Sequence, residues 1–182
     1  MILLNSVSNK NLGDPTPEVT WWKENRLIDN SYEMTFTNVI QNTLEIGPLT
    51  RQDLGTVLTC QSSNNNISIP LSYKVELDLV FAPTDVSITS LGQPLSVGTE
   101  YAMECEAAGS RPDPVITWWL GDTFLGHNNQ VVEKIGNISK SVLKFTPKHL
   151  DDQKVLTCRA ENTEIKDGAI QDSWKLTVYC KS

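Results

Sequence analysis

The chain repeats one pattern of tryptophan, cysteine and short apolar runs at a spacing of roughly a hundred residues, the size of a small domain. Trp21-Trp22 in the first half matches Trp118-Trp119 in the second. The run Val-Leu-Thr-Cys at 57–60 returns at 155–158 with nearly the same offset. Two distant blocks that keep one spacing indicate two tandem domains rather than a solenoid of small repeats.

The boundary between the repeats is expected to be short. The apolar pattern of the first repeat ends near Phe81, and Ala82-Pro83 leads directly into the second repeat without a Gly or Ser spacer. We therefore place the two domains at residues 1–81 and 82–182.

Apolar and polar residues alternate at a period of two in both halves, as in strands with one buried face. Val19/Trp21 and Ile116/Trp118 are examples. Turn formers such as Asp-Pro, Gly-Asp and Asn-Asn separate the runs, and no long window has helical periodicity. The pattern predicts an all-β chain of two β-sandwiches.

The paired tryptophans are expected to have different roles, because neighbouring residues of a strand point to opposite faces. Trp21 and Trp118 share the parity of the apolar residues before them and are predicted to be core residues. Trp22 and Trp119 then face outward. Each is expected to pack under the aliphatic stem of a Lys or Arg on a neighbouring strand. The alternative is a binding anchor, since tryptophan is enriched at interface hot spots.

The second half has a cysteine on each side of its tryptophan pair, Cys105 before it and Cys158 after it. In β-sandwiches this order is typical of a disulfide that bridges the two sheets, with the tryptophan packed on it. We therefore predict a Cys105–Cys158 disulfide, which stabilises by about 4 kcal/mol through chain entropy and forms in an oxidising compartment. Two buried thiols in a reduced cytosolic protein are the alternative, because cysteine count alone does not exclude them.

The first half has no cysteine before its tryptophan pair. When the spacing of the second half is applied to the first, the missing cysteine corresponds to Ser8, or to Ser6 if the following loop is longer. Residues 1–8 are expected to form the strand that normally carries this cysteine, with Ile2 and Leu4 inward.

Two cysteines are left without an evident partner. Cys60 is predicted to be a buried free thiol beneath Trp21, and Cys180 a second free thiol near the C-terminus. The strand that would precede residues 1–8 is expected to be absent, so the first β-sandwich is predicted to be truncated on its N-terminal side. We expect it to be the less stable domain.

Charge and motif content argue against several classes of function. The formal net charge of -7, with Lys and Arg scattered singly, provides no basic stripe for nucleic acid. The sequence contains no Gly-rich phosphate loop, no Gly-x-Ser-x-Gly elbow and no His-Glu-x-x-His motif. His127 and His149 have no neighbouring ligands at metal spacing. The chain is therefore not expected to be an enzyme or to bind a metal, a cofactor or a small-molecule substrate.

Several blocks of the sequence resemble the immunoglobulin domains of the insect Sidestep family. They are Pro-x-Pro-x-Val/Ile-Thr-Trp-Trp in both halves, residues 23–29, the run at 57–66, residues 155–162 and residues 172–176. The similarity covers most of residues 13–179. Each sandwich is accordingly expected to be an immunoglobulin-like domain.

The resemblance implies a function at the neuronal cell surface. Sidestep-family proteins are membrane-anchored, carry several immunoglobulin domains, and bind Beaten-path-type immunoglobulin proteins on other cells to guide axons. The chain would then be an extracellular segment of a single-pass recognition and adhesion receptor, with its signal peptide and membrane span outside these residues. The resemblance also implies that partner contact lies mainly at an outermost domain, and that these two are the next along the stalk.

Two Asn-x-Ser triplets are consistent with an extracellular location. They begin at Asn66 and Asn137 and are expected on turns or strand edges, where a glycan projects into solvent. We therefore predict that the protein is a glycoprotein modified at these two asparagines.

Two other interpretations remain open. One is a secreted immune-type immunoglobulin binding protein, which needs a signal peptide and no downstream anchor. The other is a misbounded gene fragment without independent function, because family-like sequence begins abruptly at Gly13 and stops near Val178. The coding sequence on either side of the chain would distinguish all three interpretations.

Overall fold

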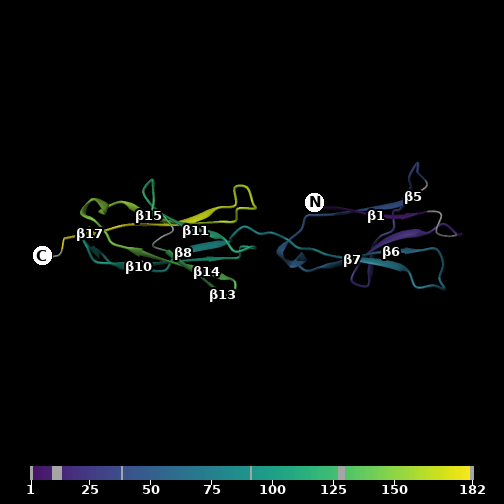
Figure 1. The fold of residues 1–182 in the computed structure, drawn as a ribbon, viewed down its shortest axis with the longest axis horizontal. Helices are drawn as coiled ribbons and strands as arrows, with labels where there is room; N and C mark the ends of the chain where they lie inside the picture. Colours follow the sequence, from purple (N-terminus) through teal and green to yellow (C-terminus); the bar gives the residue numbers. More distant parts are fainter. Residues whose placement is uncertain (1, 10–13, 38, 91, 127–129, 181–182) are drawn as a thin grey trace. The chain divides into compact units, whose positions relative to one another are not determined.

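The computed structural model describes residues 2–9, 14–37, 39–90, 92–126 and 130–180 (Figure 1). They divide into two compact units, residues 1–79 and 80–182, called unit 1 and unit 2 here. Each unit is a β-sandwich of two packed sheets, and short 3₁₀ turns at Arg51–Asp53 and His149–Asp151 precede the strands that carry Cys60 and Cys158.

Unit 1 consists of antiparallel strands in two sheets. The strands are β1 (Ile2–Asn9), β2 (Glu18–Lys23), β3 (Arg26–Asp29), β4 (Glu33–Met34), β5 (Val39–Ile46), β6 (Val57–Ser63) and β7 (Leu71–Glu76). One sheet has the order β1-β5-β4, and the other has the order β3-β2-β6-β7. The core lies between them, where alternate residues of the facing strands meet. It consists of Val19, Trp21, Ile40, Leu44, Leu58, Cys60 and Leu77.

The strand expected over residues 1–8 is present as β1 and pairs with β5. Leu4 packs against the core, whereas Leu3 and Val7 are exposed, so the predicted inward parity is confirmed. The side chain of Ile2 lies outside the described residues. Among the described residues no strand pairs with the other side of β1, which makes it an edge strand.

Unit 2 has more strands. They are β8 (Asp85–Ile88), β9 (Leu95–Ser96), β10 (Tyr101–Ala108), β11 (Val115–Leu120), β12 (Thr123–Phe124), β13 (Gln130–Ile135), β14 (Ile138–Phe145), β15 (Val155–Glu161), β16 (Ile170–Lys175) and β17 (Val178–Tyr179). The sheet β13-β14-β10-β8 packs on the sheet β12-β11-β15-β16, and β17 pairs with β9 in parallel. In unit 2, β10 therefore has a strand on each side.

The core of unit 2 is larger than that of unit 1 and contains the predicted disulfide. Cys105 on β10 and Cys158 on β15 join the two sheets, with their Cα atoms 6.5 Å apart. Trp118 is fully buried beside them, and its indole N–H donates a hydrogen bond of 2.9 Å to the Ser141 hydroxyl. Because a buried indole N–H needs an acceptor, this bond allows the tryptophan to fill the core.

Unit 2 begins at Val80, before the expected boundary at Ala82. Phe81 forms a β-bridge with Arg111, in which each backbone N–H donates to the carbonyl of the other residue. These two bonds attach Phe81 to the loop before β11. The segment expected to close the first repeat therefore belongs to unit 2, and the division falls after Leu79.

Candidate functional site

A serine occupies the position of the missing cysteine in unit 1. The Ser6 hydroxyl forms a hydrogen bond with the Cys60 thiol, whereas Ser8 accepts a bond of 3.0 Å from the Ser62 hydroxyl. Ser6 pairs with Asn42 on β5; Asn42 is buried and Ser6 is partly buried. Of the two serines left open by the sequence, Ser6 is therefore the equivalent of the first cysteine of unit 2.

Cys60 is buried and forms no disulfide. Burial raises the pKa of its thiol, and the hydrogen bond with Ser6 offsets part of this effect. A thiol with a raised pKa stays protonated at neutral pH and is a poor nucleophile. Cys60 is thus a structural residue. Cys180 is also free and is exposed.

The two outward tryptophans are half-buried in equivalent positions on β2 and β11. The indole N–H of Trp22 donates to the Thr20 hydroxyl at 2.9 Å, and that of Trp119 donates to the Thr117 hydroxyl at 3.2 Å. The ring of Trp119 contacts the ring of Phe124, with centroids 5.2 Å apart and a tilt of 48°. Aromatic contact therefore positions this side chain.

The outward side chains of β11, β12, β15 and β16 form a surface that we call the outer face of unit 2. It comprises Thr117, Trp119, Phe124, Thr157, Arg159 and Ser173. The hydroxyls of Thr157 and Ser173 bond each other at 2.9 Å, and Arg159 forms an ion pair of 2.9 Å with Glu161. Aromatic and arginine side chains, such as those of Trp119, Phe124 and Arg159, are enriched at protein interfaces.

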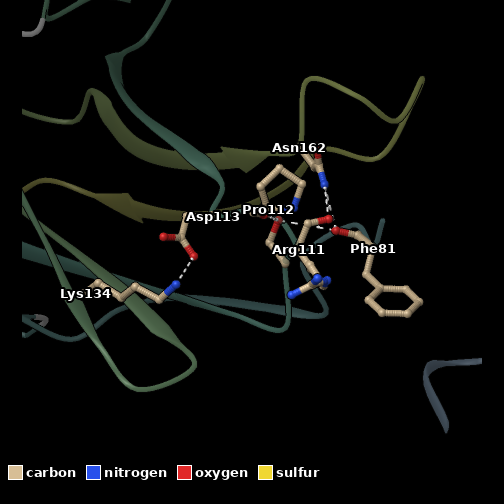
Figure 2. Close-up of polar contacts among 7 residues, drawn as sticks. Phe81, Arg111, Pro112, Asp113, Lys134 and Asn162 are labelled. Carbon is tan, nitrogen blue, oxygen red and sulfur yellow. Dashed lines mark hydrogen bonds and ion pairs between the residues drawn. The ribbon is translucent and has the colours of Figure 1, made fainter. Parts of the chain in front are cut away.

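Hydrogen bonds of the Asn162 side chain hold Phe81, at the start of unit 2, close to the loop before β11. Figure 2 shows its side-chain amide directed at two backbone carbonyls, those of Phe81 at 2.9 Å and Arg111 at 2.7 Å. Its own carbonyl oxygen accepts the Glu164 N–H at 3.0 Å. Asn162 is 2% exposed, and both its side-chain nitrogen and its side-chain oxygen have hydrogen-bond partners. Buried polar groups generally need such partners. The sequence does not predict this role of Asn162, because its hydrogen-bond partners Phe81, Arg111 and Glu164 lie in three separate segments.

Lys134 and Asp113 form an ion pair of 2.7 Å near the hydrogen bonds of Asn162 (Figure 2). Both side chains are more than half exposed, so the pair contributes little stability. The ion pair places one positive and one negative charge beside the loop before β11. This loop contains Arg111, which forms the β-bridge with Phe81.

The two sequon asparagines lie where a glycan has room. Asn66 is exposed between β6 and β7, and Asn137 is exposed at the turn from β13 to β14. We expect the chain secreted from insect cells to lose mass on treatment with peptide N-glycosidase F. The Asn66→Gln and Asn137→Gln variants should each remove one glycan, and the double variant should be insensitive to the enzyme. A double variant that still loses mass would contradict the assignment.

A metal ion needs several ligand side chains at a suitable spacing. No group of three or more His, Cys, Asp or Glu side chains gathers at metal-binding distance among the described residues; His127 lies outside this part of the chain. None of the described helices has the length and apolar character needed to cross a lipid bilayer.

Comparison with known proteins identifies both units as immunoglobulin-like domains. Residues 6–73 match the family model "Immunoglobulin domain", and residues 85–167 match the model "CD80-like C2-set immunoglobulin domain". The I-band fragment I67-I69 from titin superposes with a TM-score of 0.65, covering 98% of this chain and 60% of that chain. At 20% sequence identity, this likeness concerns the fold alone.

The chain is homologous to immunoglobulin-superfamily cell-surface proteins. It is 25% identical to nephrin of Rattus norvegicus over 170 residues, which cover 91% of this chain and 13% of nephrin. It is 26% identical to protein sidekick-2 of Mus musculus over 164 residues, which cover 88% of this chain and 7% of sidekick-2. The chain thus spans only a small part of the length of these relatives.

Proposed function

We propose that the two domains are an extracellular segment of a cell-surface adhesion and recognition protein, which acts by binding another immunoglobulin-superfamily protein. The observation that carries the proposal is the homology of about nine tenths of the chain to nephrin and sidekick-2, across both domains. A protein of this class acts through a surface rather than through a catalytic centre.

The disulfide of unit 2 supports an extracellular location. Disulfides of this kind form and persist in oxidising compartments, and Cys105–Cys158 is fully buried. The exposed asparagines of both sequons agree with passage through the secretory pathway. The proposal places the protein at the cell surface, anchored by a membrane span outside these residues.

The Sidestep resemblance makes the proposal more specific. It names axon guidance as the process and a Beaten-path-like immunoglobulin protein as the partner. The blocks that carry this resemblance lie on β2, β3, β6, β11, β15 and β16. In unit 2 these blocks include Trp119, Thr157, Arg159 and Ser173 of the outer face.

A cell-based binding screen tests the proposal. The full chain is displayed on non-adherent insect cells behind a signal peptide and ahead of a membrane anchor. Soluble ectodomains of immunoglobulin-superfamily proteins, including Beaten-path proteins, are then applied as multivalent probes. We expect at least one ectodomain to stain the cells well above cells that carry the anchor alone. Displayed protein with an intact disulfide that binds none of the panel would contradict a partner-binding role for these two domains.

Trp119 is the residue of the outer face expected to matter most for this binding. Its Ala variant loses a large aromatic contact, and hot-spot tryptophans contribute about 2 kcal/mol or more, which is a loss of roughly 30-fold in affinity. The matched control is Val131→Ala, an exposed residue on β13 in the opposite sheet. Surface plasmon resonance should show weakened binding for the first variant only, with unchanged circular dichroism. Equal affinities would assign Trp119 to packing alone.

A further inference from the structure

The strand β13 of unit 2 is an edge strand with exposed apolar side chains. It pairs with β14 on one side, and among the described residues no strand pairs with its other side. Val131, Val132 and Ile135 are 56%, 53% and 61% exposed. The backbone groups of a free edge can pair with another strand, and apolar side chains on that edge add to the attraction. β13 is therefore a place where two copies of the chain can associate.

The charges of β13 do not oppose such pairing. Proteins commonly protect an edge strand with charged side chains, which repel a second copy. β13 has one negative residue, Glu133, and one positive residue, Lys134, so the strand carries no net charge. Lys134 forms its ion pair with Asp113, and Glu133 lies opposite Lys140 of β14. Both charges thus have opposite charges nearby within unit 2, and the strand does not repel another copy strongly.

Unit 1 protects the corresponding edge by keeping its strand short. There β4 pairs with β5 as β13 pairs with β14. β4 comprises only Glu33–Met34, whereas β13 comprises six residues. A very short edge strand offers few backbone groups for pairing. The turn from β4 to β5 contains no Asn-x-Ser or Asn-x-Thr triplet, whereas the turn from β13 to β14 contains the sequon that begins at Asn137. The long edge strand is thus the one that has a sequon at its end.

Asn137 lies where a glycan can reach the exposed side chains of β13. Gly136 and Asn137 form the turn between Ile135 and Ile138, which pair with each other. Gly136 has a φ of 61°, as the first position of a type II′ turn requires. Asn137 is exposed in this turn. Val131 lies on the same face of β13 as Ile135 and is roughly 13 Å further along the strand, a distance that the first sugars of a glycan span.

The chemistry of N-acetylglucosamine, the first sugar of an N-glycan, suits this strand. One face of its ring carries C–H groups and its acetyl group ends in a methyl, so it can cover apolar side chains and remove their surface from water. Its hydroxyl groups can form hydrogen bonds with the free backbone groups of the edge and with solvent. A glycan is also bulky, so a second strand cannot approach the edge that it covers.

We propose that the N-glycan of Asn137 lies along β13, contacts Ile135 and Val131, and prevents two copies of the chain from pairing through this edge. The inference rests on the glycosylation of Asn137, which the sequon predicts. It does not depend on partner binding by the outer face of unit 2, because that face belongs to the opposite sheet.

Analytical ultracentrifugation of the full chain secreted from insect cells tests the proposal, after mass spectrometry has established the glycan at Asn137. We expect the Asn137→Gln variant to self-associate more tightly than the unmodified chain by about ten-fold or more, because β13 is then uncovered. Asn66→Gln is the matched control, since it removes one glycan from unit 1 and leaves β13 covered. It should sediment as the unmodified chain does.

Hydrogen–deuterium exchange locates the contact. At a dilution where all proteins are monomeric, the amides of β13 should exchange faster in Asn137→Gln than in the unmodified chain, whereas those of β10 should exchange equally. As the concentration of the variant is raised, exchange of β13 should slow again. Enzymatic removal of the glycan from the folded, unmodified chain should give the same pattern, so the result does not depend on the substitution.

Lysine substitutions on β13 test the mechanism of association. Val131→Lys with Ile135→Lys, added to Asn137→Gln, should abolish the gain in self-association, because charged side chains on a free edge repel a second copy. Ile67→Lys with Ile69→Lys is the matched control. These two isoleucines of unit 1 are exposed, and the same added charge should not abolish the gain.

Three outcomes would overturn the proposal. One is an unmodified chain without a glycan at Asn137, a result that would leave the partner-binding role of the outer face untouched. Another is an Asn137→Gln variant that self-associates no more tightly than Asn66→Gln. The third is equal suppression of self-association by the Val131/Ile135 pair and the Ile67/Ile69 pair of lysine substitutions, because total charge rather than the edge of β13 would then control it.

Discussion

The Ser6→Cys variant is expected to form a disulfide with Cys60 and to raise the free energy of unfolding of unit 1 by about 2–4 kcal/mol. The Ser6 hydroxyl already contacts the Cys60 sulfur, and β1 and β6 lie in opposite sheets. The new bond would close a loop similar to that of Cys105–Cys158, whose sequence separation is 53. It would restrict the unfolded chain as the native bond does in unit 2.

Titration of thiols and hydrogen exchange check this prediction. In a Cys180→Ser background, the denatured oxidised variant should show no free thiol, and exchange of the unit 1 core should slow. Ser8→Cys is the matched control, since Ser8 has the same inward parity but contacts Ser62 instead of Cys60. A Ser6→Cys protein that keeps both thiols free, or a Ser8→Cys protein that oxidises equally well, would show that Ser6 does not occupy the cysteine position.

Removal of the native disulfide by Cys105→Ala with Cys158→Ala is expected to lower the free energy of unfolding of unit 2 by about 2–5 kcal/mol. Both cysteines are fully buried next to Trp118, so the change also removes packing from the centre of the core. Unit 1 contains no disulfide and should be unaffected.

The chain contains two compact units, so we do not expect a single unfolding midpoint to describe it. Hydrogen exchange should be followed in each unit while urea is raised, with and without dithiothreitol. We expect the reductant to accelerate exchange in unit 2 only. Cys60→Ala serves as the control for loss of a buried cysteine that is not cross-linked. Equal sensitivity of both units to the reductant, or insensitivity of unit 2, would contradict the assigned role of the bond.

Much of the fold follows from local patterns. Alternation predicted the strands around Trp21 and Trp118 and the inward parity of β1, because one face of each strand is buried. The order of Cys105, Trp118 and Cys158 predicted the disulfide, because a bond between sheets requires residues on facing strands. These features depend on short segments, so they can be found without knowing how the segments are arranged.

Features that depend on loop length or on distant partners could not be predicted in the same way. Ser6 and Ser8 have the same parity, and only the path of the chain from β1 to β2 decides between them. The ring of Phe124 was missed as the neighbour of Trp119, because it arrives from the next strand after a turn.

The hydrogen bonds made by Asn162 have a mechanical consequence for unit 2. Tension applied through the chain before Phe81 reaches the two backbone bonds to Arg111 and the Asn162 amide together. Those bonds must rupture before the force can peel β8 from β10. Under load, β8 should therefore stay paired with β10 until the hydrogen bonds at Asn162 and Arg111 have broken.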